Sequence, residues 1–252
     1  MGTRVTPARD TRAAEWVVDG LRGFGDSVLS VVPAGLPTYV RVFHPAYRGP
    51  LADPAPVRWA EIAETHGKRY HAGMQLSAVT GRIQFWNERP PADFDWWPKM
   101  PMPRDLVMPL AAILARHTNT ADRCWFATWE GYGDLPDDVR QAPIFGAGHR
   151  FHLQTGPITA VMERTTDPSY ADHSPNIWWP DDHAWCVAGE IDLDSTYVAC
   201  DKPCAQELLS APELEALRID SATGIDIASD ALNPQPELDW KQQRRLRPTG
   251  RR

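Results

Sequence analysis

The sequence predicts an α+β fold, a single domain with a mixed or mainly antiparallel sheet and helices packed on it. Segments with helical and with strand-like periodicity are intermixed along the chain, without the regular strand-helix alternation of parallel α/β proteins. No internal repeat of roughly 20 to 50 residues is visible, which argues against solenoids and propellers. The 252 residues, of which 42% are hydrophobic and 23% charged, have the composition of a globular domain.

Local patterns in the first hundred residues predict two helices and two strands. A first short helix is expected to end near Gly20, and the β-branched and aromatic residues 38–43 predict a strand between two prolines. The proline-rich residues 45–56 are expected to form a loop. Apolar side chains recur with helical spacing over residues 59–66, and residues 83–86 predict a further strand before a long proline-rich stretch.

The middle of the chain contains the clearest helix and strand patterns. Asp105 is expected to cap a helix that continues to His117 and buries a stripe of leucine and isoleucine side chains. Residues 123–129 predict a buried strand that ends at a Gly-Tyr-Gly turn, and residues 150–154 predict another strand.

Two helices are expected in the last third of the chain. Asp201 and Pro203 favour a helix start, and the capping-box pattern at residues 210–213 predicts a second short helix through Leu217. Past this point the hydrophobic pattern decays. The predicted organisation is a flexible N-terminus at residues 1–12, a globular α+β domain at 13–220, and a flexible, disordered C-terminal tail at 221–252 that is basic after residue 240.

Charge is distributed unevenly along the chain. The total is −7; residues 241–252 hold six Lys or Arg and no acid, and residues 1–12 hold three Arg and one Asp, so residues 13–240 carry −15. An acidic body repels phosphates, which argues against nucleic-acid binding through it. Nucleic acid is expected to bind through the tail Lys241–Arg252 if at all.

The sequence also argues against several classes of protein. The polar N-terminus has no hydrophobic signal region, so we expect a cytoplasmic protein, and no apolar stretch is long enough for a membrane span. Arg outnumbers Lys 22 to 4, a bias that indicates a GC-rich, bacterial source. The four cysteines are expected to be buried or free thiols and not disulfides. No cofactor is expected.

Two pairs of adjacent tryptophans suggest a binding surface. The chain has 11 tryptophans, and both pairs lie in proline-rich segments. Neighbouring side chains of an extended segment point to opposite sides, so at least one ring of each pair is expected at the surface, where indoles favour protein contacts. Two aspartates follow the second pair. The predicted binding residues are Trp96, Trp97, Trp178, Trp179, Asp181 and Asp182.

A metal site is considered as an alternative to the preferred expectation of no metal. His173, Asp181 and His183 combine imidazole and carboxylate groups within a short stretch of sequence. These are ligand types that hold metal ions in proteins. Their spacing matches no known zinc or calcium loop, so the trio stays an alternative.

A catalytic site is likewise considered as an alternative. Residues 184–194 alternate between apolar and polar side chains and predict one strand. Glu190, Asp192 and Asp194 would then share one face, with neighbours ~6.5 Å apart, a separation in the range of the paired carboxylates of glycosidases. The familiar hydrolase, NTPase and zinc-protease motifs are absent, so the preferred expectation is that the protein has no catalytic residues.

The segments RCWFATWEGYG, at residues 123–133, and SPNIWWPDDHAWCVA, at residues 174–188, resemble those of a group of uncharacterised proteins from GC-rich bacteria. The resemblance covers roughly residues 35–217 and implies no site residues. In its α+β layout, its tryptophan-rich loops and the motif LPDD at residues 135–138, the chain is also distantly similar to the SMI1/KNR4 superfamily. That resemblance implies a toxin-immunity or protein-binding role.

The preferred functional hypothesis is a non-catalytic module whose acidic, tryptophan-rich surface binds a basic protein partner, as immunity proteins do. The first alternative is a hydrolase that acts on a small molecule or carbohydrate through Glu190, Asp192 or Asp194. The second is a nucleic-acid-associated protein that binds through its basic tail. The lack of catalytic motifs favours a non-enzymatic role.

Overall fold

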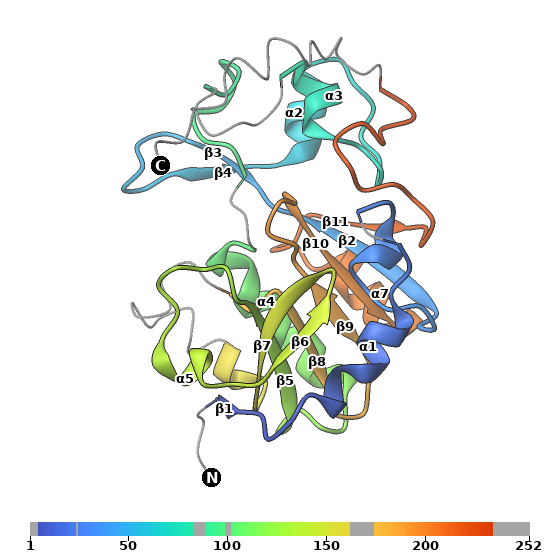
Figure 1. The fold of residues 1–252 in the computed structure, drawn as a ribbon. Helices are drawn as coiled ribbons and strands as arrows, with labels where there is room; N and C mark the ends of the chain where they lie inside the picture. The colour runs from blue at the N-terminus through green and yellow to red at the C-terminus, as the bar shows by residue number, and fades with distance from the viewer. Residues whose placement is uncertain (1–4, 24, 83–88, 99–101, 162–173, 234–252) are drawn as a thin grey trace.

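A nine-stranded sheet forms the centre of the computed structural model, which describes residues 5–23, 25–82, 89–98, 102–161 and 174–233. All of its assigned strand pairs are antiparallel. Helices pack on the sheet, and Figure 1 shows how they surround it. The predicted α+β class with a mainly antiparallel sheet is therefore confirmed.

Most elements lie where the sequence predicts them, and the predicted strand 83–86 lies outside the described residues. The strands are β1 (Thr6–Pro7), β2 (Thr38–Phe43), β3 (Ala46–Arg48), β4 (Ala55–Val57), β5 (Cys124–Trp129), β6 (Ile144–Ala147), β7 (His149–Gly156), β8 (Ile177–Pro180), β9 (Cys186–Ala188), β10 (Ser195–Cys200) and β11 (Ala216–Ile219). The α-helices are α1 (Glu15–Gly20), α2 (Trp59–Thr65), α3 (Leu76–Thr80), α4 (Arg104–Leu114), α5 (Asp137–Arg140) and α7 (Lys202–Ser210), and the 3₁₀ turns are η1 (Arg12–Ala14), η2 (Val28–Ser30) and η3 (Ala115–His117).

Both faces of the sheet are buried. The strands follow the order β1-β7-β5-β8-β9-β10-β2-β11, with β6 also paired to β7. Leu110 of α4 and Leu208 of α7 pack with Trp178 on one face. Val17 of α1 packs with Trp179 on the other face. Burial of two faces explains why the central strands consist almost entirely of apolar side chains.

A smaller unit lies at one end of the molecule, beyond the sheet (Figure 1). It consists of the β3–β4 hairpin, α2 and α3, whose apolar side chains form a separate buried cluster with Phe94. The loop predicted over residues 45–56 therefore contains two short strands. Backbone pairing explains the difference, because Tyr47 and Trp96 exchange N–H···O bonds of 2.9 Å in both directions and hold the hairpin in place.

The second helix predicted through Leu217 is wrong. This segment forms β11, in which Leu217 lies opposite Arg41 of β2. Nearby, the Glu215 carboxylate accepts hydrogen bonds of 2.8 Å from the backbone N–H groups of Trp59 and Ala60 and so caps the start of α2. Pairing with a distant strand thus outweighs the local capping pattern.

Helix α4 begins at Arg104, with Pro103 in the capping position, so Asp105 lies in the first turn and does not cap the helix. Its charge is still favourable there because the N-terminus of a helix carries partial positive charge. With 11 residues, α4 is far shorter than a bilayer is thick. Across the described ranges, no helix has the length and apolar character needed to cross a membrane.

The described structure continues across the boundaries predicted at residues 13 and 220, and both ends of the described chain pack against the body. Near the N-terminus, β1 pairs with β7, and Val5 and Ala8 are buried. At the other end, residues 221–233 run from β11 to α3, and Ile225 joins the core. These segments are ordered because they bury apolar side chains that would otherwise meet water. The tail Lys241–Arg252 lies outside the described residues.

Arg41 is a buried cation that joins the sheet to the smaller unit, and its side chain is only 1% exposed. Its Nε donates to Ser195 Oγ at 2.9 Å. Its Nη1 donates to the carbonyl oxygens of Ala72 and Met74 at 2.9 and 2.7 Å, and its Nη2 lies 3.6 Å from the Asp194 carboxylate. Every arm of the guanidinium thus has a partner, as a buried charge requires.

Arg41→Met should lower the free energy of unfolding by about 3–5 kcal/mol, because it leaves Asp194 without its cation and two buried carbonyl oxygens without a donor. Urea unfolding followed by circular dichroism measures the change. Arg12→Met is the control: the Arg12–Asp10 pair is exposed, with side chains 82% and 47% accessible, so we expect a change within about 0.5 kcal/mol. Equal effects of the two variants would contradict the role assigned to Arg41.

Candidate functional site

A pocket of about 280 Å³ opens on the face of the sheet that packs with α1. It is bounded by segments that lie far apart in the sequence: the region around η2, the β6–β7 hairpin with β8, the loop between β9 and β10, and the chain after β11. Most of its walls are apolar. The apolar side chains include Val31, Phe151, Ile177, Leu193, Ile225 and Ile227.

The loop between β9 and β10 brings Glu190 to the pocket. The strand predicted over residues 184–194 ends at Ala188, and the chain then turns, with Asp192 N donating to Glu190 Oε2 at 2.7 Å. The prediction that Glu190, Asp192 and Asp194 share one strand face is therefore wrong. Because β9 and β10 are antiparallel neighbours, the chain has to reverse between them, and the alternation cannot continue as a strand.

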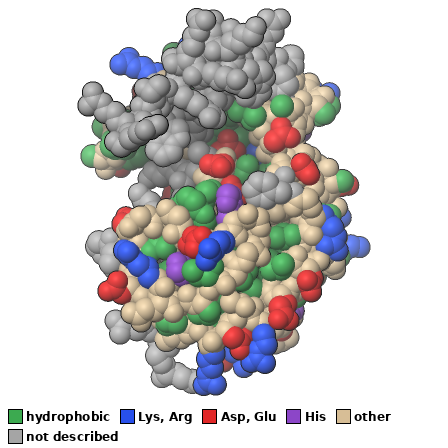
Figure 2. Space-filling view, in the orientation of Figure 1, with side chains coloured by type: hydrophobic (Ala, Val, Ile, Leu, Met, Phe, Trp, Pro, Cys, Tyr) green, Lys and Arg blue, Asp and Glu red, His purple; other side chains and the backbone are tan. Residues whose placement is uncertain are grey.

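His149 forms an ion pair with Glu190, with 3.1 Å between His149 Nε2 and Glu190 Oε1. It is the first residue of β7 and follows Gly148, whose φ of 79° makes the tight turn of the β6–β7 hairpin. The two side chains are 31% and 21% exposed and both line the pocket, although Glu190 Oε1 itself is buried. Figure 2 shows histidine and acidic side chains among hydrophobic ones on the face that carries this hairpin.

Asn176 holds the backbone beside this ion pair. Its Nδ2 donates to Gly189 O at 3.2 Å and to Tyr132 Oη at 3.1 Å, and its Oδ1 accepts from Trp129 N at 2.9 Å. Burial raises the pKa of Tyr132 to about 12, the Asn176 bond opposes this shift, and the charge of Glu190 adds to it. The Tyr132 phenol is therefore a neutral structural group at the back of the site.

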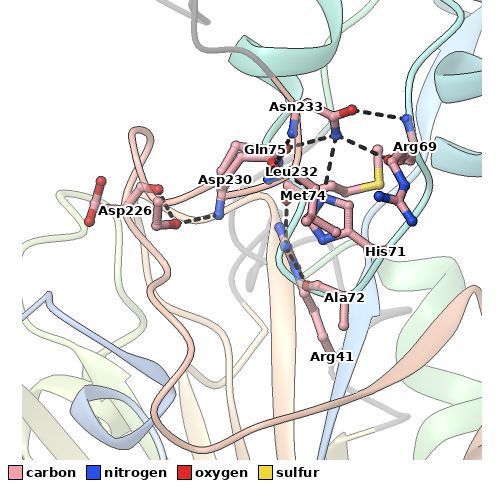
Figure 3. A network of polar contacts seen from close by, with 11 residues as sticks. Arg41, Arg69, His71, Ala72, Met74, Gln75, Asp226, Asp230, Leu232 and Asn233 are labelled. Carbon is pink, nitrogen blue, oxygen red and sulfur yellow. Dashed lines mark hydrogen bonds and ion pairs between the residues drawn. The ribbon is translucent and has the colours of Figure 1, made fainter.

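The chain after β11 supplies one wall of the pocket, at residues 225–227. Asp230 anchors this wall and is fully buried; it accepts hydrogen bonds from Gln75 N at 3.2 Å and Asn233 N at 2.9 Å and contacts His71 Nε2 at 3.0 Å. Figure 3 shows the network. Burial raises the pKa of Asp230, but the hydrogen bonds outweigh burial and hold it below its ordinary 3.8.

Asp194, the third acid of the predicted catalytic alternative, is not among the residues that line the pocket. Its carboxylate lies 3.6 Å from Arg41 and accepts a 3.5 Å hydrogen bond from Ser195 Oγ. Burial raises the pKa of Asp194, and the charge of Arg41 opposes that shift. Glu190 and Asp192 line the cavity, whereas Asp194 serves as the counter-ion of a buried arginine.

The predicted tryptophan surface is wrong for β8. Trp178 and Trp179 are both 0% exposed. They do point to opposite faces, as an extended strand requires, but β8 lies in the middle of a sheet that is covered on both sides. In the smaller unit, Trp97 is half-buried against the apolar cluster, and Trp96 is 41% exposed. Trp96 alone of the four predicted tryptophans is exposed.

The two predicted aspartates stabilise local structure. Asp181 accepts a hydrogen bond of 3.0 Å from Trp125 Nε1 and pairs with Arg123 at 2.6 Å. Asp182 accepts a 2.7 Å hydrogen bond from Thr118 Oγ1, and several such bonds outweigh burial and lower its pKa. Both carboxylates are thus engaged in tying β5 and the end of α4 to the turn after β8.

The structure does not bring the predicted metal trio together within the described residues. His173 lies outside them, and the His183 ring stacks on Trp16 with 4.3 Å between centroids. Burial lowers the pKa of His183, and the neighbouring acids, Asp181 first, oppose this shift. In the described part of the chain, the possible metal ligands that lie close together are His117, Asp201 and Cys204.

Sequence reasoning missed His149, Asn176 and the wall at residues 225–227. A histidine at a hairpin turn carries no local sign that a glutamate from another hairpin will meet it. The wall falls within the predicted tail at residues 221–252, although its Ile-Asp-Ile alternation is typical of a segment with one apolar side. Of the two isoleucines, Ile225 is buried and Ile227 is 38% exposed.

Comparisons with known proteins leave the site to be interpreted from its own residues. No family model, curated protein or solved structure matches this chain. The resemblances noted in the sequence stay predictions.

Asp230→Asn should lower the free energy of unfolding by about 1–3 kcal/mol, because the amide replaces a charged acceptor of several buried N–H groups. The folded-state pKa is lowered, so the carboxylate stabilises the protein above pH 3.8 and this contribution is lost as the pH falls through the lower folded value. The variant should therefore lose less stability on acidification. Urea unfolding at several acidic pH values measures both effects, and Asp19→Asn, which changes an exposed carboxylate, is the control. The assignment would be contradicted if the free energy of unfolding of Asp230→Asn fell with decreasing pH as steeply as that of the wild type.

Proposed function

We propose that this protein acts on a small organic molecule held in the pocket, with Glu190 and His149 as its acid–base pair. The proposal rests mainly on the 3.1 Å contact between the imidazole and the carboxylate in the wall of a largely apolar cavity. Ligand sites combine apolar walls with a few convergent polar groups. Carboxylates and imidazoles are also the side chains that most often transfer protons in enzymes.

The walls of the pocket indicate the chemistry of the ligand. Besides its apolar side chains, the pocket has three carboxylates, Glu190, Asp192 and Asp226, against the single imidazole of His149. This balance favours a neutral or positively charged molecule. The volume of about 280 Å³ is at the small end for ligand sites. We infer a small, largely apolar molecule with a hydrogen-bond donor or a positive charge, and we favour it over a carbohydrate, which is polar on all sides.

Hydrolysis is the reaction class that this pair would serve best. Glu190 accepts a proton from water as the water oxygen bonds to an electrophilic carbon of the ligand. His149, the acid of the pair, donates its proton to the leaving group as the bond between that group and the carbon breaks, and the proton held by Glu190 then passes to His149. The hydroxyl of water stays on one product, one proton leaves with the other, and both side chains return to their starting state.

Glu190→Gln should reduce turnover by about 10²–10⁴-fold, because glutamine keeps the shape of the side chain but cannot accept the proton. Release of nitrophenolate from a panel of p-nitrophenyl esters, including esters of amino acids that carry a positive charge, gives the rate. His149→Asn should lower it by a similar factor.

Glu130→Gln is the matched control, because Glu130 pairs with Arg150 at 3.1 Å and does not line the pocket. It should leave turnover unchanged. If the wild type hydrolyses none of the esters faster than buffer does, or if Glu190→Gln keeps full activity, the proposed reaction is wrong.

A protein-binding role is the second candidate, and it is supported by the smaller unit. Trp96 is 41% exposed and Leu51 is 68% exposed. Trp96 Nε1 donates to Gly49 O at 3.0 Å, and this bond holds the indole against the segment that carries Leu51. Exposed tryptophan is enriched at the energetic centres of protein interfaces. Residues 13–240 carry a net charge of −15, and the basic ends of the chain reduce the total to −7. The negative charge of residues 13–240 favours a basic partner.

Trp96→Ala should weaken binding of such a partner by at least tenfold, the usual effect of truncating a central interface tryptophan. Affinity purification from the native host, washed at two salt concentrations, identifies the partner, and titration of that protein measures the affinity. Leu209→Ala, which removes a 39% exposed apolar side chain from α7, is the control. A partner that binds both variants as it binds the wild type would place the interface elsewhere.

A further inference from the structure

Metal-ligating side chains gather where β10 runs into α7. His117 at the end of η3, and Asp201 and Cys204 at the start of α7, each offer a ligand atom, and these atoms lie within 4.8 Å of one another. A thiol, an imidazole and a carboxylate thus meet at one point, and none of them lines the pocket.

The start of α7 explains why these groups converge. Asp201 caps the helix, and its Oδ1 accepts a 2.8 Å hydrogen bond from Cys204 N. This bond places the carboxylate and the cysteine side chain on the same side of the first turn. Cys204 is 1% exposed, whereas Asp201 is exposed, so the cluster has one side in the core and one side open to solvent. An ion can therefore enter from the surface.

Glu207, one turn further along α7, orients the imidazole. Its Oε2 lies 2.7 Å from His117 Nε2, and its Oε1 accepts a 3.0 Å hydrogen bond from Arg116 Nε. The hydrogen bonds from Arg116 and then His117 lower the pKa of Glu207, which keeps the carboxylate ionised. Histidines that bind metal commonly donate their other ring N–H to a carboxylate in this way.

We propose that Cys204, His117 and Asp201 bind a zinc ion. Thiolate, imidazole and carboxylate are the ligand types that hold Zn²⁺ in a tetrahedral site. At the bond lengths usual for zinc, neighbouring ligand atoms lie about 3.5 Å apart, so a group now within 4.8 Å has to contract by only about 1 Å. Three protein ligands leave one tetrahedral position for water, and the ion would tie the start of α7 to η3.

Cobalt substitution tests the site directly. The full-length protein, without a histidine tag, is kept reduced with a phosphine, stripped with EDTA and titrated with Co²⁺. We expect one Co²⁺ per chain, a near-ultraviolet thiolate-to-cobalt band and the visible bands of tetrahedral cobalt, all of which one equivalent of Zn²⁺ removes. Cys204→Ser and His117→Asn should each weaken binding by at least tenfold, and Glu207→Gln by about tenfold.

Cys186→Ser is the matched control, because Cys186 is a fully buried cysteine on the opposite face of the sheet. It should keep the wild-type spectrum. His117→Asn changes a side chain that is 18% exposed, so it stays informative if Cys204→Ser does not fold. The proposal is overturned if the wild type shows no thiolate-to-cobalt band, or if the bands persist in His117→Asn with unchanged affinity.

Discussion

The buried guanidinium of Arg41 is the interaction on which the arrangement of the two units depends. A charge in a protein core is stable only when its donors are satisfied, and the donors of Arg41 bind Ser195 of the sheet and the carbonyl oxygens of residues 72 and 74. The position of the loop at residues 72–74 is therefore coupled to the sheet. The same loop continues into Gln75, which donates to Asp230, and Asp230 anchors the wall of the pocket. One buried cation is thus connected to a wall of the cavity through Gln75 and Asp230.

The chemistry of the pocket is carried by turns, and the sheet keeps those turns in place. Glu190 belongs to the turn between β9 and β10, and His149 to the turn between β6 and β7. Strands buried on both faces cannot shift without exposing apolar surface, so they form a rigid base for such loops. The ion pair therefore forms between two independently fixed hairpins. This differs from the predicted pair of neighbouring carboxylates on one strand, because the partners come from different parts of the chain.

Elements with strong local patterns could be predicted from the sequence, and the failures have identifiable physical causes. The strand at residues 38–43 was predicted because β-branched and aromatic residues between prolines favour it locally. The strand over residues 184–194 was predicted too long, and a helix was predicted through Leu217, because pairing with distant strands decides both segments. Of the candidate site, Glu190 could be found as one of the acids that alternate with apolar side chains in residues 184–194. His149 could not, because only the folded sheet brings it to Glu190.

The position of β2 has a consequence for how the chain is made. Its two neighbours in the sheet are β10 and β11, and 154 residues separate Arg41 from Ser195. At a synthesis rate of about 5–20 residues per second, β2 leaves the ribosome roughly 8 to 30 seconds before its partners exist. During that time the apolar strand has two open edges, a condition that favours pairing with other chains. Both edges of β2 are therefore covered only after β10 and β11 have emerged, so the end of the sheet that holds β2 and β11 is the last part to form.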